Sequence, residues 1–264
     1  MEQLSSLLLL LFASHLPLAV TDSALTSEEV AVVQRAEPIP ALKELTATTF
    51  VDSLSRLYDA IGLQKYDLSF DAFKYGMTGY LSLLHEDKLN DKGLLTIIDF
   101  TKSSNSKRFY TIDLKNLAVK FHTYVSHGRN TGDVMAKSFS NTVHSNQSSL
   151  GFYVTAETYV GSKGYSLKLD GMEKGYNDKL RERAVVMHDA DYVSENWIKK
   201  YGRLGRSQGC PALPKSISKK IIDTIKNRTA IFAYYNDSAY LSASSYLNPE
   251  NLFAPVLASS QARN

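Results

Sequence analysis

The sequence predicts an α+β fold that is mostly β, with a β-rich central domain and peripheral helices. Short apolar runs of strand length recur from about residue 94 to residue 235, and turn-forming residues separate them. Two stretches with helical apolar spacing precede these runs, and one more interrupts them late. With 264 residues, of which 44% are hydrophobic, the chain is long enough to bury a substantial core.

The first residues have the features of an export signal. Residues 4–20 form a leucine-rich apolar run that is short for a membrane span and lies at the very start of the chain. We therefore predict a signal peptide over residues 1–23 and an exported protein of the periplasm or the extracellular cell envelope. The residues before the run carry no Lys or Arg, and residues 19–24 offer several weak cleavage sites, so an uncleaved N-terminal anchor is the alternative.

Two helices are expected after a polar linker at residues 24–40. In the first, apolar residues recur at three- and four-residue spacing from Leu42 to Ile61. The second begins near Ser69, a good N-cap residue, and places Phe73 and Met77 on one face. Together they predict an N-terminal helical support at residues 41–90.

A change of pattern near Leu94 marks the start of the strand-rich domain, predicted at residues 91–240. A single helix interrupts the strands late, because isoleucines form a stripe behind Pro214. Residues 241–264 are rich in Ser, Ala and Pro and predict a C-terminal tail. The strand candidates are residues 94–100, 108–114, 117–125, 151–160, 165–169, 184–188 and 229–235.

The charge pattern and the histidines exclude two classes of function. The net charge is only +3, and Lys and Arg are spread along the chain without the basic block that nucleic-acid binding needs. His122, His127 and His144 lack the spacing of a metal-ligand pair, and the chain has a single cysteine. We therefore expect no nucleic-acid partner, no metal and no cofactor, and we expect a monomer.

The single cysteine, Cys210, is the candidate nucleophile. An exported chain with one cysteine forms no internal disulfide, so the thiol is either deeply buried or used. Residues 202–211 read GRLGRSQGCP, and their three glycines predict a sharply bent loop that a substrate can approach closely. A thiol at the end of such a loop is placed for nucleophilic attack. A buried structural cysteine is the alternative.

The candidate base is His188, which ends a short apolar run of strand character. A thiol and an imidazole on either side of a glycine-rich loop form the layout that Cys–His acyl transfer needs. Arg203 and Arg206 lie close to the cysteine in sequence and are candidates to supply positive charge. The backbone N–H groups of Gly209 and Cys210 are candidate donors to an oxyanion.

These motifs resemble the signature of the murein L,D-transpeptidases, cysteine-dependent peptidoglycan transpeptidases that carry a His, a spacer and then Ser/Thr-x-Gly-Cys. The matching residues are VMH at 186–188 and GRSQGC at 205–210. The resemblance is continuous from about residue 70 to residue 240. It extends to the segments at residues 96–100, 127–130, 139–141, 148–153 and 177–178.

The resemblance implies an L,D-transpeptidase-like β-rich catalytic domain that acts on peptidoglycan stem peptides. Such enzymes attack the bond after the third residue of a stem peptide, form a thioester and pass the acyl group to another amine. Cys210 matches the nucleophile and His188 the base. Gly209 matches the oxyanion region, and Ser207 the position whose backbone carbonyl orients the imidazole. The resemblance also implies acylation of Cys210 by carbapenem-type β-lactams.

Three positions depart from the family pattern. Gln208 stands where much of the family has a second His, and Ala212 where an Arg commonly follows the cysteine. Asp189 replaces a Gly after the motif histidine, where its carboxylate either raises the pKa of the imidazole or faces solvent. We therefore expect Arg206 or Arg203 to bind the substrate carboxylate, with a role in bracing their own loop as the alternative.

His127 follows a predicted strand and precedes a polar turn, so it is a candidate to help hold the substrate. A structural hydrogen bond is the alternative role for this residue. Three rival functions also stay open: a carboxypeptidase or endopeptidase in which water accepts the acyl group, a wall-binding module without catalysis, and a redox thiol protein that pairs with a partner thiol.

Overall fold

The computed structural model describes residues 39–248, and side chains are described from residue 48 onward. The predicted signal peptide, most of the predicted linker and the last part of the predicted tail lie outside these residues. No helix within residues 39–248 combines the length and the apolar character needed to cross a membrane.

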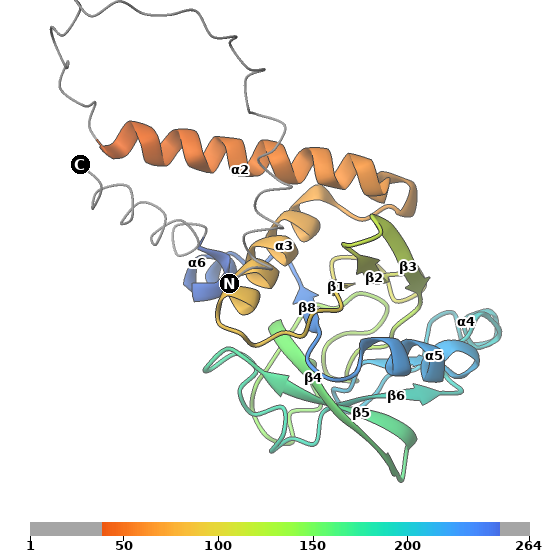
Figure 1. The fold of residues 1–264 in the computed structure, drawn as a ribbon. Helices are drawn as coiled ribbons and strands as arrows, with labels where there is room; N and C mark the ends of the chain where they lie inside the picture. Colours follow the sequence, from red (N-terminus) through yellow and green to blue (C-terminus); the bar gives the residue numbers. More distant parts are fainter. Residues whose placement is uncertain (1–38, 249–264) are drawn as a thin grey trace, which may run out of the picture.

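One eight-stranded sheet forms the centre of the molecule (Figure 1), and the expected α+β class is confirmed. The strand order is β3-β2-β1-β8-β4-β5-β6-β7. The β1–β8 and β6–β7 pairs are parallel, and the other neighbouring pairs are antiparallel. The strands are β1 (Leu94–Asp99), β2 (Phe109–Asp113), β3 (Ala118–Thr123), β4 (Gly151–Gly161), β5 (Gly164–Gly171), β6 (Val186–Ala190), β7 (Ala212–Pro214) and β8 (Ala230–Tyr234).

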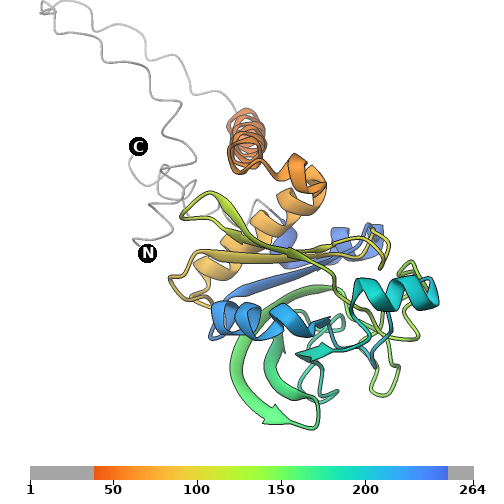
Figure 2. The same ribbon diagram turned by 90° about the vertical axis from the view of Figure 1, so that its right-hand side faces the viewer.

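Helices lie around this sheet, and Figure 2 shows α3 lying across it with α2 stacked on the far side of α3. Ser69 caps α3 as expected, because its Oγ accepts a hydrogen bond from the N–H of Ala72 at 3.2 Å. Helix α4 is an addition that the apolar pattern did not indicate. The helical elements are α2 (Ile39–Ile61), η2 (Leu63–Tyr66), α3 (Phe70–His85), α4 (Glu195–Tyr201), α5 (Lys215–Ile225), α6 (Ser238–Ala243) and η3 (Ser245–Leu247).

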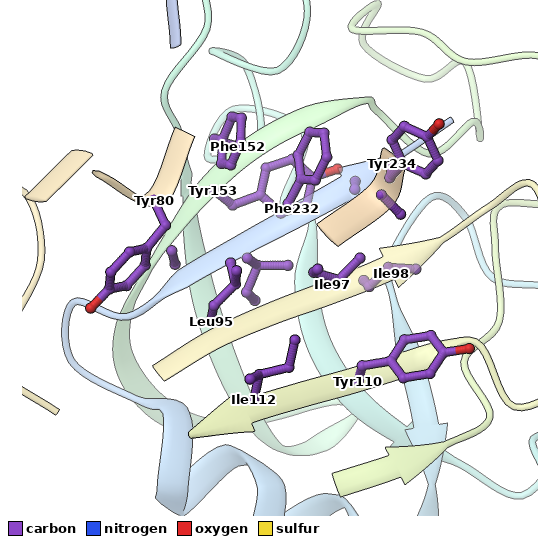
Figure 3. Close-up of a cluster of buried hydrophobic side chains, with 14 of the residues drawn as sticks. Tyr80, Leu95, Ile97, Ile98, Tyr110, Ile112, Phe152, Tyr153, Phe232 and Tyr234 are labelled. Atoms are coloured by element: carbon purple, nitrogen blue, oxygen red, sulfur yellow. The ribbon is translucent and has the colours of Figure 1, made fainter. Parts of the chain in front are cut away.

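The main core lies between α3 and the sheet (Figure 3). Phe152 on β4 and Phe232 on β8 stack there with their ring centroids 4.3 Å apart. Gly79 brings α3 close to this pair, because a Cβ at that position would lie 2.0 Å from the Phe152 ring. The tight contact sets the position of α3 on the sheet.

Residues 238–247 pack against the domain through a buried carboxylate. Glu173 accepts hydrogen bonds from the hydroxyl of Tyr240 at 3.0 Å and from the N–H of Phe152 at 2.6 Å. Burial raises the pKa of Glu173, and these donors oppose that shift. The carboxylate therefore ties α6 to the start of β4.

Candidate active site

Cys210 lies at the end of the glycine-rich loop that joins α4 to β7. Gly202 ends α4 with φ 76°, and the N–H of Gly205 donates to the carbonyl of Tyr192 at 2.9 Å. Gly209 has φ 119°, and a Cβ there would lie 2.7 Å from the carbonyl oxygen of Gln147. Only glycine fits this backbone conformation in this space, so the loop delivers the half-buried cysteine in a defined position.

The thiol of Cys210 lies beside the start of β6. The N–H of Val186 donates to Sγ at 3.5 Å, and Sγ is 3.8 Å from the carbonyl oxygen of Ala184. Burial raises the pKa of the thiol, and the Val186 N–H and the positive charges of Arg183 and Lys163 oppose that shift. Because burial is the largest effect, the resting group is a protonated thiol that needs a base.

His188 lies on β6, next to the strand that follows the cysteine. The parallel pairing of β6 and β7 sets His188 opposite Ala212, two residues after Cys210 in the chain. The ring is 3% exposed, and its Nδ1 is 2.7 Å from the carbonyl oxygen of Asp189. A carbonyl only accepts, so Nδ1 carries the proton and Nε2 is the basic nitrogen.

Burial holds the pKa of His188 below its ordinary value. The nearby charge of Lys163 lowers it further, whereas the carbonyl and the carboxylate of Asp189 raise it. The expected increase from the Asp189 carboxylate is therefore present but outweighed. His188 is a neutral imidazole at neutral pH, which is the form that accepts a proton.

Ser207 acts through its side chain, which corrects the expectation that its carbonyl orients the imidazole. That carbonyl accepts the N–H of Arg129 at 2.8 Å, and the carbonyl of Asp189 is the one beside His188. The Ser207 hydroxyl instead donates to the carbonyl of Cys210 at 2.6 Å and accepts the N–H of Gly209 at 3.0 Å. It closes the turn that holds the thiol, and the N–H of Gly209 is engaged there in the resting state.

Arg203 and Arg206 converge on Asp133. The Asp133 carboxylate lies 2.8 Å from Nε of Arg203 and 3.2 Å from Nη1 of Arg206. Arg206 also donates to the carbonyl of Gly132 at 3.1 Å, and Arg203 to that of Leu204 at 2.8 Å. These contacts favour the loop-bracing role over the expected binding of a substrate carboxylate.

His127 is buried and hydrogen-bonded within the protein. It is 1% exposed, its Nδ1 accepts from Nη2 of Arg108 at 2.8 Å, and its Nε2 faces the carbonyl of Asp133 at 3.1 Å. Burial and the charge of Arg108 lower the pKa of His127 to about 4. Both ring nitrogens are used, which agrees with the alternative reading of a structural hydrogen bond.

A sequence model described as the L,D-transpeptidase catalytic domain matches residues 64–234, from η2 to the end of β8. The chain belongs to this family. The matched residues include both Cys210 and His188. No curated protein matches the chain.

Solved L,D-transpeptidases are distant matches. The enzyme from Mycobacterium smegmatis is 13% identical with a TM-score of 0.33, over 54% of this chain and 59% of that one. LdtMt1 in complex with imipenem is 13% identical with a TM-score of 0.34, also over 54% and 59%. The enzyme from Stackebrandtia nassauensis is 15% identical with a TM-score of 0.33, over 70% and 78%. The chain thus spans less than two thirds of the first two structures.

Three further residues of this L,D-transpeptidase domain are coupled electrostatically to the thiol. Arg183 and Lys163 favour the thiolate of Cys210, and that negative charge in turn raises the pKa of Tyr192. Burial is the larger cause of the Tyr192 pKa of about 12. Gly205 packs against this tyrosine, because a Cβ at residue 205 would lie 2.5 Å from its ring. No spacing in the sequence indicated these three residues.

Among the residues described by the structure, no cluster of three or more His, Cys, Asp or Glu side chains is arranged to hold a metal ion.

Proposed function

We propose that the protein is an exported peptidoglycan L,D-transpeptidase that forms a thioester between Cys210 and a stem peptide and transfers the acyl group to an amine acceptor. One observation carries the proposal. The pairing of β6 with β7 brings His188 beside the segment that begins with Cys210, and β6 also donates the Val186 N–H to the sulfur. The only thiol of the chain and a neutral imidazole thus share one edge of the sheet.

The resting protonation states define the first half of the reaction. Nε2 of His188 accepts the thiol proton while Sγ attacks the carbonyl carbon of the scissile peptide bond. The tetrahedral intermediate collapses to a thioester, and the imidazolium returns the proton to the departing amine. The Asp189 carbonyl, which accepts from Nδ1–H, stabilises the positive charge on the ring during these steps.

The second half repeats this chemistry with an acceptor. An amine from another stem attacks the thioester carbon, His188 removes the amine proton, and Sγ leaves as the thiolate and recovers that proton. If water attacks instead, the product is a shortened stem with a free carboxylate. The carboxypeptidase or endopeptidase alternative therefore differs only in the acceptor and uses the same acyl-enzyme.

Incubation of the purified protein with muropeptides, followed by mass spectrometry, tests the proposal. New cross-linked dimers are expected for the wild type, and unchanged muropeptides for Cys210→Ala. Shortened stems without dimers would assign the reaction to the water-accepting alternative. Unchanged muropeptides with the wild type would favour a non-catalytic wall-binding module.

A further inference from the structure

Arg183 lies just before β6, and both terminal nitrogens of its guanidinium donate to neutral groups. Nη1 donates to the carbonyl of Ser140 at 2.7 Å and to the hydroxyl of Ser149 at 2.6 Å. Nη2 donates to the hydroxyl of Ser145 at 3.3 Å and to the carbonyl of Gln147. The four N–H groups of the two terminal nitrogens are therefore used, and the fifth donor, Nε–H, cannot by itself form a two-bond fork with a substrate carboxylate.

The positive charge of Arg183 has no carboxylate partner among the described side chains. By contrast, Arg181 pairs with Glu157 at 3.1 Å and also with Asp170. Burial lowers the pKa of Arg183, and the groups whose negative charge would raise it are Tyr153 and Cys210. Tyr153 is a buried phenol that stays protonated, so the thiolate of Cys210 is the anion that this cation can meet.

The segment that Arg183 holds touches the backbone next to the nucleophile. Within it, the hydroxyl of Ser148 donates to the carbonyl of Gly209 at 3.3 Å. A Cβ at residue 209 would lie 2.7 Å from the carbonyl oxygen of Gln147 and 3.3 Å from Nη2 of Arg183. The guanidinium and the segment at residues 140–149 thus form one wall of the turn that presents Cys210.

We propose that Arg183 is a positioning residue for Cys210. Arg183 holds residues 140–149 against the Gly209–Cys210 peptide, and it places an unneutralised positive charge beside the thiolate. The inference rests on Cys210 being the nucleophile of the proposed function. In this role Arg183 acts on the thiol and on its turn, because its four terminal N–H groups are already occupied by residues 140–149. Lys163 in the β4–β5 turn and the Val186 N–H on β6 also act on this thiol. Tyr192 after β6 is affected by the charge of the thiolate, and His188 on β6 stands opposite Ala212.

Alkylation of Cys210 by iodoacetamide, followed by intact-protein mass measurement between pH 7 and pH 10, tests the charge without any substrate. In Arg183→Gln the alkylation rate at pH 8 is expected to fall about tenfold. The curve of alkylation rate against pH should shift to higher pH by about one unit. Arg183→Lys keeps the charge and should react within about threefold of the wild type, although it loses the planar fork. Arg181→Gln removes an exposed, paired arginine two residues away and should leave the profile unchanged.

An unchanged alkylation profile in a folded Arg183→Gln variant would overturn the inference and leave Arg183 as a loop brace. An equal shift of the alkylation profile in Arg181→Gln would overturn the inference as well, because the shift would then follow from the change in net charge of the protein. If Arg183→Gln does not melt cooperatively, Ser145→Asp decides, since a carboxylate beside Nη2 neutralises the guanidinium in place. Slower alkylation in Ser145→Asp supports the inference, and wild-type alkylation refutes it. A wild type that alters no muropeptide refutes the proposed function without changing these rates.

Discussion

At the scale of single residues, the resting site holds an uncharged thiol and an uncharged imidazole. Burial raises the pKa of Cys210 and lowers that of His188, so both shifts disfavour a resting thiolate–imidazolium pair. The tautomer set by the Asp189 carbonyl leaves Nε2 free to accept a proton. In the proposed reaction, His188 therefore removes the thiol proton as the sulfur attacks.

His188→Ala should slow acylation of Cys210 by about 10²–10⁴-fold, which is the usual contribution of a general base. The difference in acylation rate between the wild type and His188→Ala should become smaller as the pH rises, because the thiol then ionises without help from the imidazole. Single-turnover acylation with a stem peptide measures both effects. His85→Ala, which changes an exposed histidine at the end of α3, is the matched control. A decrease of less than tenfold would show that another group serves as the base.

A carbapenem should acylate Cys210 once, because its strained amide carbonyl offers the sulfur the same electrophile as a scissile peptide bond. Intact-protein mass measurement after incubation should show one adduct on the wild type. Cys210→Ala should show none. An adduct of equal yield on the alanine variant would mean that the label is carried by another residue.

Arg206→Lys tests the loop-bracing role. The Asp133 pair is partly exposed, so its loss should cost about 1 kcal/mol or less of stability. Any loss of activity should be the same fraction on stem peptides with free and with amidated carboxylates, because an arginine that braces its loop does not bind the substrate carboxylate. A loss confined to the free carboxylate would restore the substrate-binding role expected from the sequence.

At the scale of elements, β6 sets the geometry of the site through its register with β7. Val186 and His188 are two residues apart and so face the same side of the strand. The first supplies an N–H to the sulfur, and the second stands opposite Ala212. A slip of one residue would replace the imidazole with the Asp189 carboxylate. Secondary-structure pairing thus decides which residue of β6 stands opposite the segment that follows Cys210.

Gly79→Ala should destabilise the fold by about 1–3 kcal/mol, because the added methyl group overlaps the Phe152 ring and pushes α3 from the sheet. Gly76→Ala is the matched control on the same helix. Its Cβ would lie 3.0 Å from the flexible end of Ile97, and the gain in helix propensity is about 1 kcal/mol, so it should stay near wild-type stability. Urea unfolding curves compare the two. Equal effects would show that helix propensity and not the Phe152 contact dominates.

At the scale of the whole molecule, the buried cation of Arg108 holds residues 125–127, and the carbonyl of His127 accepts the N–H of Ser207 in the site loop. The fully buried guanidinium of Arg108 donates from Nε to the carbonyl of Val125 at 3.2 Å and from Nη2 to His127. Because His127 lies beside this cation, protonation of its ring is strongly disfavoured in the folded state. The network therefore makes folding sensitive to acid.

The sign of this effect follows from the pKa of His127, which is about 4 in the folded protein and 6.5 ordinarily. The unfolded chain binds the extra proton first, so stability is lost as the pH falls from 6.5 toward 4. Between pH 7 and pH 4.5, the free energy of unfolding should therefore fall by about 2.5 kcal/mol less in His127→Gln than in the wild type. Urea unfolding at the two pH values measures it, with the exposed His144→Gln as control. Parallel losses in the wild type and His127→Gln would contradict the assignment.

The sequence by itself determined the α+β class, the candidate nucleophile and base, and the resemblance to the L,D-transpeptidases. These depend on local patterns: apolar periodicity, a glycine-rich loop and the order of Cys210 and His188 along the chain. Export and cleavage of the N-terminus stay predictions, because the relevant residues lie outside those that the structure describes.

Only the tertiary structure decided which partners each polar side chain has. Arg203 and Arg206 pair with Asp133, and Arg183 binds residues 140–149. These partners are far apart in sequence, and apolar periodicity does not predict such pairs. Likewise, the carbonyl beside the His188 ring is that of Asp189 and not that of Ser207, whose hydroxyl donates to the carbonyl of Cys210. A cation next to a thiol in sequence can be neutralised by a distant carboxylate. The positive charges that act on Cys210 come instead from Arg183 and Lys163, which the motif does not contain.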